Sequence, residues 1–263
     1  MILDRFKLTD KVAIVTGAGR GIGAGCAVAF AEAGAHVVCA ARTQEQIDKT
    51  AVQVRAFGRR ALALECDVNE RTHLDRVVEQ TLAEFGRLDI IVNNAGGTAP
   101  SEALFTSEAA FDEALHFNVT TAFVLTRLAV PHMLKTAGGG AVVNISSAAG
   151  RFPLAGFVAY STAKAALSQM TRVLGHEFAP KVRVNAIAVG ATETTALGQF
   201  LDDDLRRKME ALTPMARLGT VEDIAIGALY LASPASSWVT GKVFEIDGGT
   251  EASNWPFPPP KLA

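Results

Sequence analysis

The stretch Val12-Ala-Ile-Val-Thr16-Gly17-Ala-Gly-Arg-Gly21-Ile-Gly23 decides the fold of this chain. It opens with a short apolar run, continues through alternating glycines, and leads into an Ala-rich segment with helical spacing. Glycine lets the backbone turn sharply and approach a ligand closely, and the N–H groups that open a helix attract phosphate. The stretch therefore predicts a strand, a tight turn and a helix whose start binds the phosphates of a nucleotide.

The spacing of the glycines narrows the class of nucleotide. Gly17, Gly21 and Gly23 follow the pattern G-x-x-x-G-x-G, and no frame gives G-x-G-x-x-G. No G-K-[ST] ending follows, which disfavours the loop that holds nucleoside triphosphates. A tight turn alone could also require these glycines, so it is their place directly after the first strand that favours nucleotide binding.

Outward from this stretch, short Val- and Ile-rich runs alternate with longer segments in which apolar residues recur every three or four positions. We interpret the runs as seven strands, at residues 12–16, 36–41, 61–65, 89–93, 141–146, 182–188 and 243–247. Helices are expected at residues 21–33, 44–57, 69–85, 107–135, 158–178 and 221–231. Because no Pro- or Ser-rich linker interrupts the alternation, the chain is predicted to be a single α/β domain over residues 1–263. It would be a doubly wound Rossmann-type domain, with a seven-stranded, mainly parallel sheet and helices on both faces.

Two segments stand outside this alternation. Residues 191–213 are rich in Thr, Leu and charge, and we expect a helical insertion near a binding site, with its charges on a solvated face. Residues 250–263 form a tail that contains Trp255-Pro-Phe-Pro-Pro-Pro, which is extended by composition. The tail is either a frayed end or a docking arm.

Composition excludes several classes of partner. The 263 residues carry 25 Lys and Arg against 27 Asp and Glu, a net charge of −2, so there is no field to attract nucleic acid or an anionic membrane. The longest apolar candidate, residues 119–134, holds Arg127, Pro131 and His132, which disfavour a membrane span. A small molecule is the expected partner.

The cysteines and histidines point to no covalent or metal framework. Cys26, Cys39 and Cys66 cannot form a complete set of disulfides, and the N-terminal residues show no signal peptide, so a reducing, cytoplasmic location is expected. The five histidines show no ligand spacing, and no metal site is expected.

The tip of the second predicted strand bears on the choice of nucleotide. NAD sites usually offer a carboxylate to the ribose hydroxyls at this point. Here the strand ends Cys39-Ala-Ala-Arg42, and Glu45 is the first acid that follows. Guanidinium groups at Arg42 and Arg20 suit the 2′-phosphate of NADP, which a carboxylate would repel. NADP(H) is therefore favoured over NAD(H), against the alternative of two ordinary surface arginines.

A candidate catalytic pair lies early in the helix at 158–178. Tyr160 and Lys164 are one turn apart and share a face. A neighbouring ammonium favours the phenolate and lowers the pKa of a tyrosine, which makes proton transfer by a phenol feasible. Ser147, 13 residues before Tyr160, ends the fifth strand, where open α/β sheets bind ligands. Ser146 or Ser147 could instead cap the next helix, and capping is the preferred interpretation for Ser146.

Together these motifs resemble the short-chain dehydrogenase/reductase family. The resemblance covers residues 8–249 and rests on motifs in family order and spacing. They are residues 16–23, Asp67-Val68, Asn93-Asn94-Ala95-Gly96, Asn118, Ser147, Tyr160 with Lys164, and residues 185–194.

The resemblance implies a role for each of four catalytic residues. Tyr160 would protonate the carbonyl oxygen during reduction, and Ser147 would polarise that oxygen. Lys164 would lower the pKa of the tyrosine and hold the nicotinamide ribose. Asn118 would anchor a water that passes protons to Lys164, unless it is a helix-interior amide bonded to backbone.

It also implies the contacts of the cofactor. Asp67 and Val68 would flank the adenine, and residues 94–96 would pass beneath the ribose. The full expected set is Gly17, Gly19, Arg20, Gly21, Ile22, Gly23, Arg42, Asp67, Val68, Asn94, Ala95, Gly96, Tyr160, Lys164, Gly190, Thr192 and Thr194.

One departure from the family pattern follows the sixth strand. The usual Pro-Gly is Val189-Gly190 here, and Thr192 replaces a branched apolar residue. Losing proline frees a fixed φ and restores a backbone donor, so a more mobile loop is expected. Because all four catalytic residues are present, loss of activity is not expected.

Small and apolar residues surround the predicted catalytic end, at 97–100, 149–154, Val189 and 197–212, which suits a lipophilic ketone or secondary alcohol. Arg151 could meet an anionic group but is expected at the surface. The pattern is similar to 3-oxoacyl-carrier-protein reductases and to bacterial hydroxysteroid dehydrogenases, and family members of this length are usually homotetramers. Three functions stay open: an NADP-dependent 3-oxoacyl-type carbonyl reductase, a hydroxysteroid-type enzyme acting on a ring ketone, and a non-catalytic NADP-binding sensor.

Overall fold

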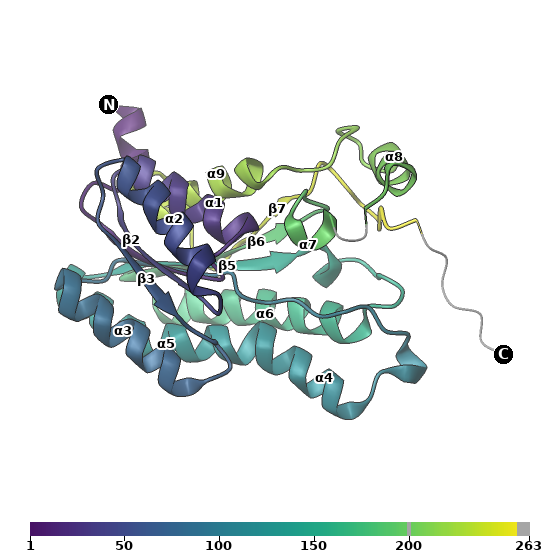
Figure 1. Cartoon of the computed structure of the whole chain (residues 1–263), viewed down its shortest axis with the longest axis horizontal. Coiled ribbons are helices and arrows are strands. Elements are labelled where there is room, and N and C mark those ends of the chain that lie inside the picture. The colour runs from purple at the N-terminus through teal and green to yellow at the C-terminus, as the bar shows by residue number, and fades with distance from the viewer. Residues whose placement is uncertain (199–200, 257–263) are drawn as a thin grey trace.

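A computed structural model describes residues 1–198 and 201–256, with the side chain of Ala196 left out. Its centre is a sheet in the order β3-β2-β1-β4-β5-β6-β7, in which every neighbouring pair is parallel (Figure 1). The strands are β1 Val12–Thr16, β2 His36–Ala41, β3 Ala61–Glu65, β4 Ile90–Asn93, β5 Gly140–Ser147, β6 Val182–Val189 and β7 Val243–Ile246. The predicted seven-stranded Rossmann-type sheet is confirmed, with strand ends that match the expected ones or differ from them by one residue.

Helices cover both faces of the sheet (Figure 1). They are α1 Gly21–Glu32, α2 Gln44–Ala56, α3 Arg71–Phe85, α4 Glu108–Leu115, α5 Thr121–Ala137, α6 Val158–Glu177, α7 Thr195–Gly198, α8 Asp203–Ala211 and α9 Val221–Ala232. Short helical turns lie at Ile2–Phe6, Ala103–Phe105, Ala148–Gly150 and Pro234–Ser236. None of the helices in the described part of the chain is both long and apolar enough to cross a bilayer.

Two apolar cores lie on opposite faces of the sheet. One is formed by α1, α2 and α9, around side chains such as Phe30 and Ile47. The other is formed by α3, α5 and α6, around side chains such as Leu125 and Met133. Because both faces are buried, the strands β1, β2 and β4 are apolar along most of their length rather than alternating.

The single helix expected at residues 107–135 is wrong. The chain forms α4, then a π-helical turn at His116–Thr120, and then α5. Inside this turn the Asn118 amide donates to the carbonyl oxygen of Ala114, at 2.9 Å. A π-helical turn keeps the chain helical while shifting the side chains that follow it, so the apolar period gave no sign of the interruption.

The insertion expected at residues 191–213 is helical, as predicted, and contains α7 and α8. Asp202 caps α8 by accepting from the backbone N–H of Leu205, at 2.7 Å. Exposed ion pairs such as Lys208–Asp204 cover the outer face, and Leu205 and Met209 are buried in a third, small apolar cluster. Of the tail, residues 250–256 are described, and the proline-rich part from 257 onward lies outside the described residues.

Candidate active site

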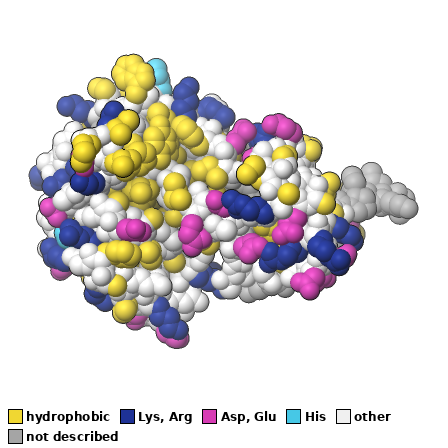
Figure 2. Space-filling view, turned by 90° about the horizontal axis from the view of Figure 1, so that it is seen from above, with side chains coloured by type: hydrophobic (Ala, Val, Ile, Leu, Met, Phe, Trp, Pro, Cys, Tyr) yellow, Lys and Arg dark blue, Asp and Glu magenta, His cyan; other side chains and the backbone are white. Residues whose placement is uncertain are grey.

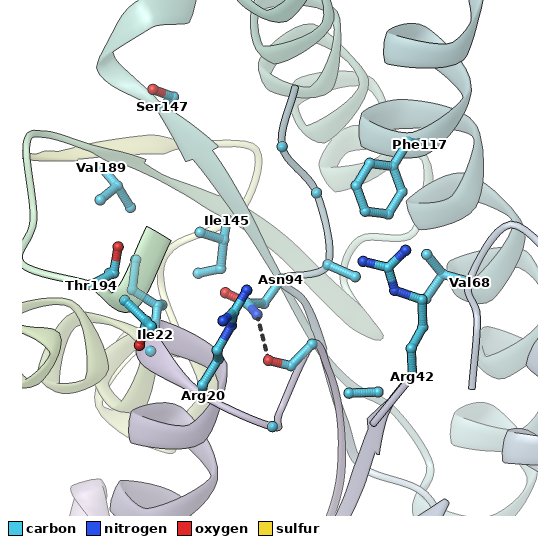
Figure 3. Close-up of a pocket in the computed structure, with 18 of the residues that line it drawn as sticks. Arg20, Ile22, Arg42, Val68, Asn94, Phe117, Ile145, Ser147, Val189 and Thr194 are labelled. Carbon is cyan, nitrogen blue, oxygen red and sulfur yellow. Dashed lines mark hydrogen bonds between the residues drawn. The ribbon is translucent and has the colours of Figure 1, made fainter. Parts of the chain in front are cut away.

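A cavity of about 640 Å³ opens at the carboxyl ends of β1 to β6 (Figure 3). This edge includes the point between β1 and β4 where the strand order reverses, and open α/β sheets bind ligands there. Most of its lining comes from the segments that follow these strands, and Phe117, Tyr160 and Lys164 come from helical segments. The lining residues are Gly17, Gly19, Arg20, Gly21, Ile22, Ala41, Arg42, Thr43, Gln46, Cys66, Asp67, Val68, Asn94, Ala95, Gly96, Gly97, Phe117, Ile145, Ser146, Ser147, Tyr160, Lys164, Val189, Gly190, Thr194 and Thr195.

Side-chain hydrogen bonds fix the loop after β1 to the loop after β4. Asn94 Nδ2 donates to the carbonyl oxygens of Thr16, at 2.9 Å, and of Gly17, at 3.2 Å. Gly17 has a φ of +64°, and a Cβ there would lie 2.6 Å from Asn94 Nδ2. The glycine is therefore required by both its backbone angle and the closeness of its neighbour.

Two arginines line the cavity. Figure 3 shows Arg20, from the β1–α1 loop, near Asn94 and Ile22, and Arg42, directly after β2, near Val68 and Phe117. Both side chains are exposed. Within the described residues neither guanidinium is paired with a carboxylate, so both are available to a bound phosphate.

Ser147, Tyr160 and Lys164 come together at the inner end of the cavity. Ser147 ends β5, and Tyr160 and Lys164 lie one turn apart at the start of α6. Lys164 Nζ is 5.7 Å from the centre of the Tyr160 ring and donates to the carbonyl oxygen of Ile145, at 2.9 Å. The sequence prediction that these three side chains would meet is matched by the geometry.

Burial acts on both titratable groups of this cluster. It lowers the pKa of the Lys164 ammonium to about 8. It also raises the pKa of the Tyr160 phenol, and the Ser147 hydroxyl acts in the opposite direction. The lowering of the tyrosine pKa expected from Lys164 is therefore wrong for the protein without a ligand, because burial raises the pKa of the phenol and the opposing effect comes from the Ser147 hydroxyl.

The serine that caps the helical turn after β5 is Ser147 and not Ser146. Ser147 Oγ accepts from the N–H of Ala149, at 3.1 Å, and so begins the turn that follows β5. Ser146 Oγ instead donates to the buried carbonyl oxygen of Lys164, at 3.0 Å. Capping by Ser146 is thus wrong.

Asn118 lies behind the cavity wall. Its Oδ1 accepts from the N–H of Gly97, at 2.8 Å, and its Nδ2 donates to Gly97 O, at 3.1 Å, and to Ala114 O. A Cβ on Gly96 would lie 2.8 Å from Asn118 Oδ1 and 3.2 Å from Lys164 Nζ, so Gly96 lies against both side chains. The amide thus supports the loop after β4, and the water relay to Lys164 stays a prediction.

Two other predicted cofactor residues do not line the cavity. Gly23 faces the loop, where a Cβ would lie 2.3 Å from the carbonyl oxygen of Gly17. Thr192 is buried and donates to the carbonyl oxygen of Gly190, at 3.1 Å. The lining residues that sequence reasoning missed, such as Thr43, Gln46 and Phe117, carry no motif, although most adjoin a predicted contact in the chain.

A second cavity, of about 150 Å³, adjoins the first at Ser147, Tyr160, Val189 and Gly190, which line both. Its remaining lining residues are Ala148, Ala149, Phe152, Leu154, Ala191, Leu197, Met209, Thr250, Ser253, Asn254 and Trp255. The pocket expected from residues 149–154, Val189 and 197–212 contributes to it, whereas residues 97–100 contribute only Gly97, to the larger cavity. The contribution of residues 250–255 was not foreseen.

Arg151 does not face this second cavity as a free cation. Its side chain is about one quarter exposed and pairs with Asp247, at 2.9 Å, with Glu251, at 3.0 Å, and with Glu245, at 3.4 Å. The expectation of an ordinary surface arginine is therefore only partly right, because the guanidinium connects the turn after β5 to the segment after β7.

Comparison with known proteins identifies relatives of this chain. The family model described as enoyl-(acyl carrier protein) reductase matches residues 17–251. An oxidoreductase from Mycobacterium tuberculosis (strain CDC 1551 / Oshkosh), described as uncharacterized, is 51% identical over 263 residues and covers 100% of both chains. The 3-oxoacyl-[acyl-carrier-protein] reductase of Thermotoga maritima is 34% identical over 244 residues, with 92% of this chain and 98% of that protein covered.

A solved structure agrees with these matches. A 7α-hydroxysteroid dehydrogenase in complex with NADH and 7-oxoglycochenodeoxycholic acid superposes with a TM-score of 0.91 at 37% identity. The superposition covers 94% of this chain and 97% of that one.

Proposed function

The chain belongs to the short-chain dehydrogenase/reductase family of oxidoreductases, and we propose that it interconverts a lipophilic ketone and a secondary alcohol with NADP(H) as its hydride carrier. One observation carries the proposal. Ser147 and Tyr160 line both the large cavity and the small one, so a carbonyl group in the small cavity would meet both hydroxyls beside whatever fills the large one.

The large cavity fits a dinucleotide. Its volume of about 640 Å³ lies within the range of cofactor sites, and Gly17 and Gly96 let the lining loops pack closely, since a Cβ on Gly17 would clash with Asn94 and one on Gly96 with Asn118. Gly21 and Ile22, at the start of α1, line the cavity, and the N–H groups there would bind the phosphates. When bound, the nicotinamide supplies the hydride.

The choice of NADP(H) rests on Arg20 and Arg42. Both are exposed, neither is paired with a carboxylate among the residues that the structure describes, and no carboxylate between Ala41 and Gln46 lines the cavity. A guanidinium binds phosphate through parallel N–H donors, so a 2′-phosphate is favoured here over a free ribose hydroxyl. The related dehydrogenase structure contains NADH, so the preference has to be measured on this protein.

Tyr160 is assigned as the general acid of reduction. Its phenol has a raised pKa in the buried site and therefore keeps its proton at neutral pH, ready to give it to the carbonyl oxygen as the carbonyl carbon accepts hydride. In the reverse direction the same oxygen takes the proton of the alcohol. Ser147 donates to the developing oxyanion and stabilises its charge.

Lys164 and Asn118 support this chemistry. With a pKa of about 8, the Lys164 amine remains mostly charged at neutral pH. Its Nζ lies 5.7 Å from the centre of the Tyr160 ring, and we assign it to hold the nicotinamide ribose. Asn118 is a positioning residue, because its amide holds the loop at Gly96–Gly97 against Lys164. The other expected contacts of the cofactor, including Asp67, Val68 and Thr194, lie around the same cavity.

A 3-oxoacyl-type or similar chain ketone is the favoured substrate class. The small cavity is lined by Phe152, Leu154 and Leu197 and takes an apolar group of limited size. The second candidate, a ring ketone of the hydroxysteroid type, is favoured by the likeness to the 7α-hydroxysteroid dehydrogenase complex. A sensor without turnover would not need Ser147, Tyr160 and Lys164 together.

The proposal includes a homotetramer. Phe123 on α5 and Val173 on α6 are exposed hydrophobic side chains, as is Ile226 on α9. Figure 2 shows hydrophobic side chains gathered on the face that carries α9. Light scattering at micromolar protein checks this part, and a monomer would contradict it.

Consumption of NADPH, followed by its absorbance, tests the function. A 3-oxoacyl thioester and a steroid ketone are offered in parallel, with NADH as the comparison cofactor. NADPH turnover with either ketone supports the proposal, and its rate in Tyr160→Phe should fall at least about 100-fold while NADPH still binds. Binding of NADPH with no turnover of any ketone would favour the sensor instead.

A further inference from the structure

The C-terminal segment, residues 250–255, contributes to the lining of the small cavity although it follows the last of the family motifs in the chain. It follows β7 and passes α8 before the described chain ends (Figure 1). Thr250, Ser253, Asn254 and Trp255 line the cavity whose inner end holds Ser147 and Tyr160. A segment beyond the last strand therefore forms part of the surface that a substrate would touch.

The segment is fixed at both of its ends. At the first end, the Arg151 guanidinium donates to Asp247, to the carbonyl oxygen of Thr250 and to Glu251. At the other end, Asn254 Nδ2 donates to Thr213 Oγ1, at 2.9 Å, in a buried hydrogen bond. These hydrogen bonds fix the backbone of residues 250–254 relative to the turn that follows Ser147.

Trp255 connects this segment to the catalytic helix through an aromatic contact. Its ring lies edge-on to Phe157, with centres 5.9 Å apart at 89°, and Phe157 lies edge-on to Tyr160, with centres 6.2 Å apart at 64°. The indole also packs against the small apolar cluster of Leu205, Met209 and Leu218. Edge-to-face contacts of this kind hold an aromatic side chain in one orientation.

The volume of the small cavity and the charges near it define which substrate groups can fit. A cavity of about 150 Å³ matches the space that benzene fills in an apolar protein core. The described residues that line the cavity include no Lys, Arg or His. Arg151, next to the lining residue Phe152 in the chain, is already paired with three carboxylates, so it leaves no charge to attract an anionic group. The cavity therefore suits one uncharged apolar group of about a single ring.

We propose that Trp255 is the specificity-determining residue of this reductase, because its indole closes the cavity beside Ser147 and Tyr160 to groups much larger than one ring. The inference rests on the proposed function and deepens it. It assigns the substrate as a ketone or secondary alcohol with a compact, uncharged apolar group on the side of the carbonyl that faces Trp255.

The ratio of kcat/KM for cyclohexanone to that for a four-ring steroid ketone, both with NADPH, tests the size limit. Trp255→Ala should lower this ratio at least tenfold, and Trp255→Phe should leave it close to that of the wild type. Trp238→Ala is the matched control, because Trp238 is the chain's other tryptophan and is 98% exposed. An unchanged ratio in Trp255→Ala, or a parallel fall of both values, would overturn the proposal.

A binding measurement separates this inference from the proposed function. In a Trp238→Phe background Trp255 is the sole tryptophan, and NADP+ with a ketone forms a complex that cannot react because no hydride donor is present. Cyclohexanone should then change the Trp255 emission saturably. If this change occurs but no ketone is reduced, the assignment of Trp255 to the ligand site is supported and the proposed function fails. A linear response that does not saturate would refute the assignment of Trp255 to the ligand site, even if the enzyme is active.

Discussion

The two cavities that meet at Tyr160 are built from different parts of the chain. The large one is formed by the loops after six consecutive strands, and its closest contacts involve glycines and backbone groups, as at Gly17. The small one is formed mostly by side chains from α7, α8, the turn after β5 and the segment after β7. The position of the first is fixed by the sheet, whereas the second can change its shape without disturbing any strand. A common cofactor chemistry can therefore be combined with many substrates.

The largest effect is expected from crowding the backbone of the large cavity. Gly17→Ala places a Cβ within 2.6 Å of Asn94 Nδ2 and 3.2 Å of the Ala95 nitrogen, at a φ of +64°. NADPH affinity should fall at least tenfold, because the loops after β1 and β4 must separate to admit the methyl group. Titration of NADPH fluorescence measures the loss.

Gly58→Ala is the matched control. Gly58 has a φ of +71°, yet a Cβ there would meet nothing within 4 Å. Both substitutions bear the left-handed backbone penalty, about 1–2 kcal/mol, and only the first adds crowding. If Gly58→Ala weakens NADPH binding as much as Gly17→Ala does, then backbone strain, and not the shape of the cavity, explains the result.

The next largest effect is expected on the preference of the large cavity for NADPH over NADH. Arg42→Ala should lower kcat/KM for NADPH by about 10- to 100-fold, because hydrogen bonds to charged groups contribute about 1.5–3 kcal/mol. The value for NADH should change much less. Lys49→Ala, which removes an equal charge from an exposed pair with Glu45, is the control. Equal losses for both cofactors in Arg42→Ala would contradict contact with the 2′-phosphate.

The smallest effect concerns stability at the junction of the cavities. Burial lowers the pKa of Lys164 from 10.5 to about 8, so the folded state is destabilised in full below about pH 8. This destabilisation disappears as pH rises from about 8 to 10.5, where the unfolded chain also loses its proton. Lys164→Met should therefore raise Tm, by about 2–4 °C for each kcal/mol gained, and the gain should shrink over that pH range.

Calorimetry at a series of pH values, without cofactor, measures this change. Turnover should be lost in the same variant, since the amine serves catalysis at the expense of stability. A gain in Tm that grows with pH would show that Lys164 is not a buried ammonium.

Much of the large cavity could be predicted from the sequence. Thr16 to Gly23, Asp67 and Asn94 each follow a strand directly, so a correct strand assignment places them at one edge of the sheet. Period and spacing could not reveal the π-helical turn at His116–Thr120, because it depends on where one amide, that of Asn118, finds its partners. The pKa of Tyr160 likewise depends on burial, which spacing does not give.

The small cavity was predicted only in part, for a physical reason. Phe152 and Leu154 follow the catalytic serine in the chain and could be foreseen. Trp255 lies 95 residues after Tyr160 in the chain and contacts Phe157, which in turn contacts Tyr160. Its position depends on Arg151 and Asn254, whose partners are distant in sequence and follow no periodic pattern.

Transfer of deuterium tests the central claim most directly. The protein is incubated with a ketone that it reduces and with NADPH that carries deuterium at its transferable position, and the alcohol is analysed by mass spectrometry. The account predicts an alcohol with deuterium on the former carbonyl carbon, formed at least about 100-fold more slowly by Tyr160→Phe. An alcohol without the label, or one formed equally fast by Tyr160→Phe, would contradict hydride transfer with Tyr160 as the acid.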